Sequence, residues 1–163
     1  MAAGNTYTQI ASTTLGSAAS SVTFSSIAGT YTDLVLVING ASSAGDSPLV
    51  YINGDYGSNY SETFLRGDGS AASSGRISSG GYINTAINPT ANVRLMEILQ
   101  FQNYSNTTTN KTVLWRGGTD ANLVVLGVAL WRNTAAINSI LVNVGSGNFT
   151  TGSTFNLYGI LAA

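Results

Sequence analysis

Short apolar runs alternate with polar turns along the whole chain, and the runs have the period of strands. In residues 154–160, which read TFNLYGI, apolar Phe155 and Leu157 alternate with polar Thr154 and Asn156. A period of two places successive side chains on opposite faces of a sheet. The runs are also rich in Val, Ile, Thr, Tyr and Phe, which suit a pleated, half-buried surface. The pattern therefore predicts short β-strands.

Ten runs of this kind can be delimited, and they are separated by Gly- and Asn-rich turns, whose residues tolerate a positive φ. The predicted strands are 6–11, 21–25, 32–39, 48–53, 60–66, 93–104, 111–117, 122–132, 138–144 and 154–160. So many short strands in one chain need two stacked sheets or a closed barrel. We predict an all-β fold, a two-sheet antiparallel β-sandwich of jelly-roll type, with residues 1–163 as a single domain.

Two segments have a pattern that does not clearly indicate a strand. Residues 91–102 contain good helix formers, but they lead into a polar hairpin tip and a plausible return strand, so a strand is favoured. The segment 67–88 is a low-complexity stretch dominated by Gly, Ser and Ala. We predict a long exposed loop there, and the alternative is an insertion that contacts a neighbouring subunit.

The polarity of the chain comes from neutral groups. Only 8% of residues are charged, against roughly 25% in a typical soluble domain. The sequence contains 20 Ser, 19 Thr and 16 Asn. Burying a neutral hydroxyl or amide costs far less than burying an ion. Such a surface can become an interface at little cost, and the alternative is a sticky, marginally soluble domain.

Charge and the lengths of the apolar runs limit the partners. The net charge is −1 and the six basic residues are scattered, so we expect no nucleic-acid partner. The longest apolar stretch, 123–131, is about half as long as a membrane helix, and the first residues do not resemble a signal peptide. Because Cys is absent, no disulfide can form. We expect a soluble protein made in the cytoplasm, with no membrane partner.

The chain lacks the residues that carry most enzyme chemistry. It has no His and no Cys, which removes the usual acid/base group, thiol nucleophile and zinc ligands. Most of the seven acids lie in or beside turns, where Asp stabilises the bend. The oxygen-rich segment 53–59 lacks the acidic spacing and final Glu of an EF-hand. We therefore predict no enzyme activity, no metal and no cofactor.

Aromatic side chains offer the other candidate chemistry. Trp115 and Trp131 lie inside predicted strands and each precedes an Arg, so we expect the Trp in the core and the Arg outside; the alternative is a platform for sugar rings. Tyrosines at strand ends and in loops, Tyr82 among them, are expected to be more exposed and thus better platforms. The candidate glycan contacts are Tyr56, Asn59, Tyr60 and Tyr104.

Three stretches, 20–43, 103–116 and 130–160, resemble a family of bacteriophage virion proteins. That family has a V-x-F strand, a short Gly turn and a Y-x-x-L-x-L strand, and this chain has Val22, Phe24, Gly29, Tyr31, Leu34 and Leu36 in those places. The carboxy-terminal stretch of the resemblance ends in GSTFNLYGI, residues 152–160. The resemblance covers most of the chain, and residues 40–92 match least.

This resemblance implies a jelly-roll-type module on a virion surface. Such modules are capsid decoration (cement) proteins or parts of tail and head fibres, and they tend to act as trimers. For this chain the resemblance implies a homotrimer on the capsid exterior, which binds the major capsid protein and stabilises contacts between capsomers. The alternative is a tail or head fibre module that binds host-surface carbohydrate.

Residues 1–9 are a candidate extended arm. The segment is small and polar at its start and then gains Tyr7, so it is suited to adding an edge strand to a neighbouring subunit. The candidate partner contacts are Thr6, Tyr7, Thr8 and Gln9. The alternative is a frayed terminus.

Overall fold

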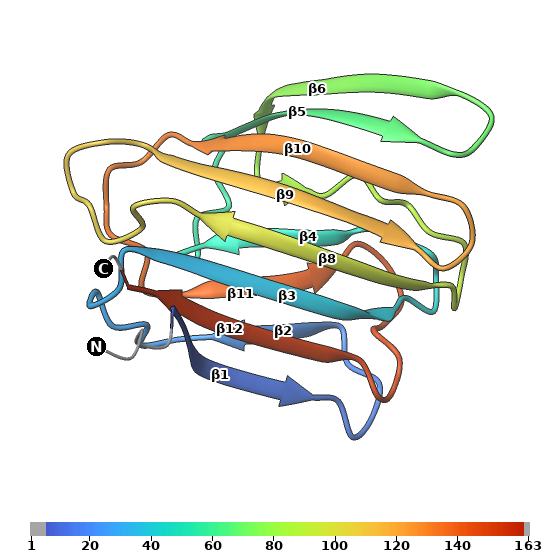
Figure 1. The fold of residues 1–163 in the computed structure, drawn as a ribbon, viewed down its shortest axis with the longest axis horizontal. Helices are drawn as coiled ribbons and strands as arrows, with labels where there is room; N and C mark the ends of the chain where they lie inside the picture. Colours follow the sequence, from blue (N-terminus) through green and yellow to red (C-terminus); the bar gives the residue numbers. More distant parts are fainter. Residues whose placement is uncertain (1–5, 162–163) are drawn as a thin grey trace.

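Twelve β-strands make up the computed structural model, which describes residues 6–161 (Figure 1). In chain order they are β1 (Tyr7–Thr14), β2 (Ser21–Phe24), β3 (Asp33–Ala41), β4 (Pro48–Ile52), β5 (Tyr60–Gly67), β6 (Ala72–Gly80), β7 (Ile83–Asn84), β8 (Arg94–Phe101), β9 (Lys111–Thr119), β10 (Val124–Trp131), β11 (Ile140–Val144) and β12 (Thr154–Ile160). Each of the ten predicted runs overlaps one of these strands. The described residues include no helix, and so none that could cross a membrane. The all-β prediction is confirmed.

The strands form two antiparallel sheets that stack as a sandwich. The larger sheet has eight strands in the order β1-β12-β3-β8-β9-β10-β5-β6, and the smaller has four in the order β2-β11-β4-β7. Figure 1 shows the eight-stranded sheet in front of the four-stranded sheet. Strands far apart in the sequence are neighbours, for example β3 and β12. The fold is thus the predicted jelly-roll-like, two-sheet β-sandwich.

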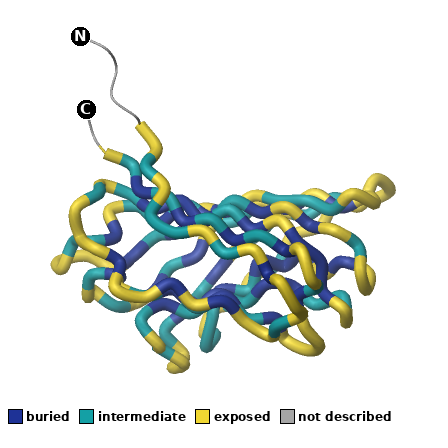
Figure 2. The backbone as a smooth tube through the Cα atoms, turned by 90° about the horizontal axis from the view of Figure 1, so that it is seen from below, coloured by how far each residue is buried: buried dark blue, intermediate teal, exposed yellow. Residues whose placement is uncertain are grey.

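Alternate residues of the strands point between the two sheets and form the core. In β3, Leu34, Leu36 and Ile38 are completely buried, and Val50 and Val142 of the smaller sheet belong to the same hydrophobic cluster. Figure 2 shows the buried positions alternating with exposed ones along the strands, with the loops mostly exposed. Removal of this apolar surface from water is the main favourable term in the stability of such a sandwich.

Glycines on the inner face of the large sheet make room for aromatic rings. A Cβ atom added to Gly127 would lie 2.3 Å from Cζ2 of Trp115, which is its direct neighbour on the adjacent strand. Gly75 has the same relation to the ring of Phe64 on the adjacent strand, and an added Cβ at Gly159 would meet the ring of Tyr31, which precedes β3. The absence of a side chain at these glycines is therefore a packing requirement, because each ring lies flat against strand backbone.

Both tryptophans lie in the core, as predicted. Trp115 is 3% exposed and Trp131 is 1% exposed, whereas the arginines that follow them are exposed. Each indole also has a hydrogen-bond acceptor: Nε1 of Trp115 donates to the carbonyl of Thr85 (3.1 Å), and Nε1 of Trp131 donates to Oδ2 of Asp55 (2.8 Å). The alternative of a sugar platform is wrong for these two residues, because neither ring face reaches the surface.

The predicted long loop at 67–88 is wrong. Residues 72–80 form β6, which pairs with β5 at the edge of the large sheet, and residues 83–84 form β7, which pairs with β4. Gly, Ser and Ala have low strand propensity, so local sequence does not signal these strands. Their pairing depends on partner strands already held in the sandwich. The helix former-rich segment 91–102 contains β8, which confirms its assignment as a strand.

Candidate functional site

The outer face of the eight-stranded sheet, turned away from the smaller sheet, is unusually apolar. Among residues 6–161, nine large hydrophobic side chains are exposed, and six aliphatic ones project from this face. They are Leu65, Met96, Leu114, Val124, Leu126 and Val128, each between 41% and 60% exposed, and we call this set the outer apolar face. An antiparallel sheet with one face in water normally alternates apolar and polar residues. Strands β5, β8, β9 and β10 depart from that rule.

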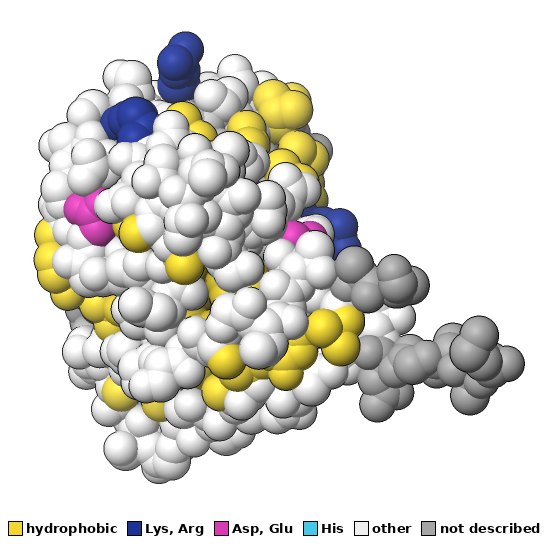
Figure 3. All heavy atoms as spheres, turned by 90° about the vertical axis from the view of Figure 1, so that its left-hand side faces the viewer, with side chains coloured by type: hydrophobic (Ala, Val, Ile, Leu, Met, Phe, Trp, Pro, Cys, Tyr) yellow, Lys and Arg dark blue, Asp and Glu magenta, His cyan; other side chains and the backbone are white. Residues whose placement is uncertain are grey.

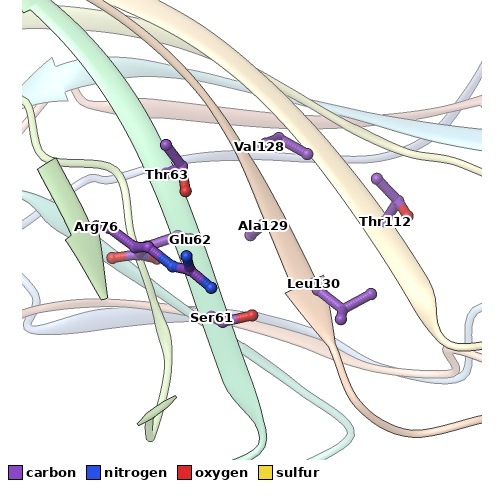
Figure 4. Close-up of a pocket in the computed structure, with 8 residues that line it drawn as sticks. All are labelled: Ser61, Glu62, Thr63, Arg76, Thr112, Val128, Ala129 and Leu130. Carbon is purple, nitrogen blue, oxygen red and sulfur yellow. The ribbon is translucent and has the colours of Figure 1, made fainter. Parts of the chain in front are cut away.

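The outer apolar face is shallowly hollowed between its strands. A hollow of about 380 Å³ is lined by Tyr7, Val35, Ile98, Leu114 and Leu126, together with Arg116 and Gln100. A second, of about 250 Å³, lies between β5, β9 and β10, where Thr63, Thr112, Val128 and Leu130 line it together with Arg76 of β6 (Figure 4). Concave, mostly apolar surfaces with a few polar groups are the usual form of binding sites.

Three arginines project from the same side of the sheet. Arg116 lies in the middle of the outer apolar face, between Ile98 and Leu126 of the adjacent strands, while Arg76 and Arg94 lie toward its margins. The guanidinium of Arg94 donates to Oδ1 of Asn39 (2.8 Å). Within the described residues, Arg76 and Arg116 make no hydrogen bond or ion pair through their side chains. On the side of the molecule that Figure 3 shows, charged side chains are few and most of the surface is neutral.

Two acids lie near these arginines: Asp33 on the sheet face, and the exposed Asp120 beside Arg94 and Met96 at its margin. Asp33 lies at the start of β3, and its carboxylate accepts hydrogen bonds from Nε2 of Gln100 (3.1 Å) and the backbone N–H of Asn103 (2.7 Å). Asp33 therefore already has partners within the chain. The outer side of the large sheet is accordingly positive in a protein whose net charge is −1.

A cluster of three tyrosines lies on the opposite side of the sandwich. Tyr51 of β4 packs against Tyr56 and Tyr82, with ring centroids 5.0 Å and 5.5 Å apart, and Tyr56 is 66% exposed. The loop that carries Tyr56 is held by Asp55. Although burial acts in the other direction, hydrogen bonds from Trp131, Asn59 and the backbone of Gly57 lower the pKa of Asp55.

The predicted glycan contacts divide into two groups. Tyr56 is exposed as expected, and Asn59 lies beside it in the loop, donating to Asp55. The expected exposure of Tyr60 and Tyr104 is wrong, because both are completely buried. Burial raises the pKa of Tyr60 to about 12. Their hydroxyl groups bind loop backbone: Tyr60 donates to the carbonyl of Asp55 (3.0 Å), and Tyr104 donates to the carbonyl of Ala28.

Strand ends at a sandwich rim pack inward as readily as outward, so position in the sequence alone did not separate these tyrosines. The tyrosines that accompany Tyr56 are Tyr51, which sequence analysis did not single out, and Tyr82, which it did. The signal for Tyr51 is its place in β4 between the buried Val50 and Ile52, which directs its ring to the outer face.

Part of the predicted arm, residues 1–9, is paired within the chain. Tyr7, Thr8 and Gln9 belong to β1, which pairs with β12 of the same chain, so their expected pairing with a neighbouring subunit is not needed to order them. Thr6 precedes the strand and is exposed. Residues 1–5 lie outside the described residues. Tyr7 is 57% exposed and packs edge-on against Tyr158. As the first strand of the sheet, β1 still presents one unpaired edge.

The two buried acids, Glu62 and Glu97, lie on separate strands. No group of three or more Asp or Glu residues within 6–161 is placed to hold a metal ion. Glu62 and Glu97 point into the sandwich from strands separated by β9 and β10. Burial raises the pKa of Glu97 to about 8 and that of Glu62 to about 7, although the backbone N–H of Asn84 donates to Glu62. Asp68 sits in the turn after β5, where hydrogen bonds from Ala71 and Ser70 lower its pKa.

Comparisons with known proteins concern the fold alone. No protein-family model and no curated protein matches the chain. Among solved structures, a galectin of Caenorhabditis elegans is 11% identical with a TM-score of 0.38, and the match covers 96% of this chain and 99% of the galectin. An exo-inulinase from Aspergillus awamori is 11% identical (TM-score 0.36, covering 94% of this chain and 29% of the enzyme). Domains LG4-5 of the mouse laminin alpha1 chain are 12% identical (TM-score 0.34, covering 92% and 41%).

Proposed function

We propose that the protein is a structural, non-enzymatic module of a bacteriophage virion, a capsid decoration protein that binds the capsid exterior as a homotrimer. The observation that carries the proposal is the outer apolar face, a broad apolar surface on a chain that has no His and no Cys. The virion is suggested by the resemblance of residues 20–43, 103–116 and 130–160 to phage virion proteins.

The composition of the surface suits this role. A protein that binds only the assembled shell stabilises it by linkage, and many copies multiply a modest contact energy. Contacts between neutral and apolar groups lose little strength at high salt, unlike exposed ion pairs. Decoration therefore needs what this chain has: a rigid sandwich, few charges and a wide contact surface. The major capsid protein is the proposed partner.

Copy number and location test the proposed role. We expect several hundred copies per particle, distributed over the head, because a decoration protein repeats with the capsid lattice. Quantitative gel analysis of purified virions and immunogold labelling measure both quantities. A handful of copies confined to the tail, or absence from the particle, would contradict the decoration role.

The tyrosine cluster favours a second candidate, a fibre module that binds host-surface carbohydrate. Tyr51, Tyr56 and Tyr82 form an accessible aromatic surface, and aromatic faces stack on the apolar faces of pyranose rings. Asn59 lies in the same loop as Tyr56, and its side-chain amide donates to Asp55, which orders that loop. Such a module would be present in few copies at the tail, so the same measurement of location separates the two roles.

Removal of the Tyr56 ring tests the second candidate. If the cluster binds a glycan, Tyr56→Ala should weaken binding to the best ligand from a bacterial surface-glycan array by roughly 3–10-fold, the value of one stacked aromatic pair. The matched control is Tyr7→Ala, which removes an equally exposed tyrosine far from the cluster. Isothermal titration calorimetry measures the affinity. Equal affinities for the two variants would exclude the cluster as the binding site.

A further inference from the structure

The sequence of β10 indicates that its outer side is covered in the working protein. Residues 124–131 read VVLGVALW, and both faces of the strand are apolar: Val125, Ala129 and Trp131 point into the core, while Val124, Leu126 and Val128 point outward. Near-continuous apolar strands are typical of sheets buried on both faces. In the described chain the small sheet covers one face, and nothing covers the other.

The outer apolar face is large enough for a specific contact with another protein. Six half-exposed aliphatic side chains present on the order of 500 Å² of apolar surface, near the upper limit for single patches on monomers. A standard protein interface buries about 800 Å² on each partner. The half-buried Val37, Ile98 and Leu130 on the same face bring the available surface toward that value.

The edges of the large sheet are less suitable for binding than its face. A register shift between Gln9 and Ala11 interrupts β1, and a second shift interrupts the pairing of β5 with β6 near Tyr60. Bulges of this kind hinder the addition of a further strand. At the other edge, β6 also carries Arg76. Docking onto the face is therefore favoured over strand addition at either edge.

Charge selects the kind of partner. Three arginines project from this side of the sheet. Of the two acids near them, Asp33 is already bonded to Gln100 and Asn103, and Asp120 lies at the margin beside Arg94. A second copy packed face to face would bring the Arg116 side chains of both copies together at the centre, and its exposed carboxylate, Asp120, would lie at the margin beside Arg94 and Met96. Like charges in an interface oppose association. A partner with carboxylates would instead pair with Arg116 at the centre.

We propose that the outer apolar face docks a partner protein whose contact surface carries a carboxylate among aliphatic side chains, with Arg116 receiving the carboxylate. The planar guanidinium can donate two parallel hydrogen bonds to it, and the surrounding leucines and valines exclude water from the pair. Such charge-assisted contacts are shorter and stronger than neutral ones. Arginine at the centre of an apolar contact is also a frequent source of binding energy.

This inference rests on the proposed docking role. Its test uses the isolated full-length chain, so the result does not depend on where the protein is located on a virion. The probe is the peptide acetyl-Leu-Glu-Leu-amide, titrated against protein with labelled Leu and Val methyl groups and followed by NMR. We expect millimolar binding, with the methyl shifts confined to Leu114, Leu126, Val128 and their neighbours. The lysine analogue acetyl-Leu-Lys-Leu-amide should bind at least fivefold more weakly.

Variants at two arginines locate the charge contact. Arg116→Gln should weaken binding of the glutamate peptide at least fivefold and leave the lysine peptide unaffected. The matched control Arg76→Gln removes a charge from the margin of the face and should change the affinity less than twofold. Equal binding of the two peptides, shifts mapping to another surface, or wild-type affinity in Arg116→Gln would each overturn the proposal.

Two further measurements exclude other occupants. Sedimentation of the wild type and Leu126→Asp shows whether the face joins copies of the chain: an oligomer that dissociates in Leu126→Asp would overturn the proposal, and an unchanged mass supports it. Flotation with phosphatidylglycerol vesicles tests whether the face binds a membrane. Binding to vesicles that is lost in Arg116→Gln would assign the face to lipid, whereas no binding supports a protein partner.

Discussion

Glu97→Gln should make the protein more stable than the wild type at pH 8.5, by about 2 kcal/mol or more, and nearly equal to it at pH 5. Glu97 is completely buried on the inner side of β8, and neither carboxyl oxygen has a hydrogen-bond partner within the described residues. The nearby hydroxyl of Thr85 donates to the carbonyl of Pro48 instead. An unpaired charge is expensive in such a place, so the folded protein keeps this carboxyl neutral.

The sign of the pH dependence follows from the raised pKa. The ordinary pKa of the Glu97 side chain is 4.5, and burial raises it to about 8 in the folded protein. Below pH 4.5 both the folded and the unfolded states hold the proton, so the contribution to stability is fully present. As the pH rises toward 8, only the unfolded state releases the proton, and stability falls by roughly 1.4 kcal/mol per pH unit. Glu62 also lowers the stability of the folded protein as the pH rises, up to its own pKa of about 7.

Urea denaturation between pH 5 and pH 8.5 measures this effect. Wild-type stability should fall across the range, Glu97→Gln should remove the larger part of the slope, and Glu62→Gln the smaller part. Asp120→Asn, at an exposed turn position, is the control and should keep the wild-type slope. A slope in Glu97→Gln equal to that of the wild type would show that the carboxyl finds water or a partner.

Gly127→Ala should destabilise the protein by about 1–3 kcal/mol, the usual cost of overpacking a core. The new methyl group would lie 2.3 to 2.7 Å from three atoms of the Trp115 indole. The indole cannot move away easily, because it is 3% exposed and its Nε1 donates to the carbonyl of Thr85. For a domain of this length, 1 kcal/mol corresponds to roughly 2–4 °C in Tm.

Gly67→Ala is the matched control for this prediction. Gly67 is also a strand glycine, and the nearest atom to an added Cβ is 3.5 Å away, an ordinary contact. Its replacement should be neutral or slightly stabilising, because alanine restricts the unfolded chain. In the double variant Gly127→Ala with Trp115→Phe, the smaller ring should recover part of the loss. Thermal unfolding followed by circular dichroism measures all four proteins. Equal stability of Gly127→Ala and Gly67→Ala would contradict the proposed packing.

The local pattern of apolar and polar residues was sufficient to assign most of the strands. Alternation in residues 154–160 and the β-branched run in 32–39 are sufficient to place β12 and β3, because side-chain period and propensity act over a few residues. Residues 72–80 were missed for the opposite reason. Their Ser- and Gly-rich sequence has no such preference, and they become a strand only because β5 offers a partner.

The candidate site was less accessible to sequence analysis. The apolar stretch 123–131 was visible as a run too short for a membrane helix, but its two faces acquire different surroundings only when the small sheet covers one of them. Tyr60 and Tyr104 looked equivalent to Tyr56 in sequence, yet they are buried. In the sequence, Arg116 is one of six scattered basic residues. Only the pairing of β9 with β8 and β10 shows that Ile98 and Leu126 lie on either side of it.

By itself, the sequence determined that this protein is built from β-strands, is nearly uncharged and lacks histidine and cysteine. These properties depend on composition and on spacing along a few residues. Only the fold shows which strands are neighbours, and therefore that residues of β5, β8, β9 and β10 share one exposed face. It also shows that the Glu97 carboxyl has no hydrogen-bond partner within residues 6–161. Strand order is set by pairings between distant segments, and a period of two distinguishes the two faces of a strand without saying what will cover either one.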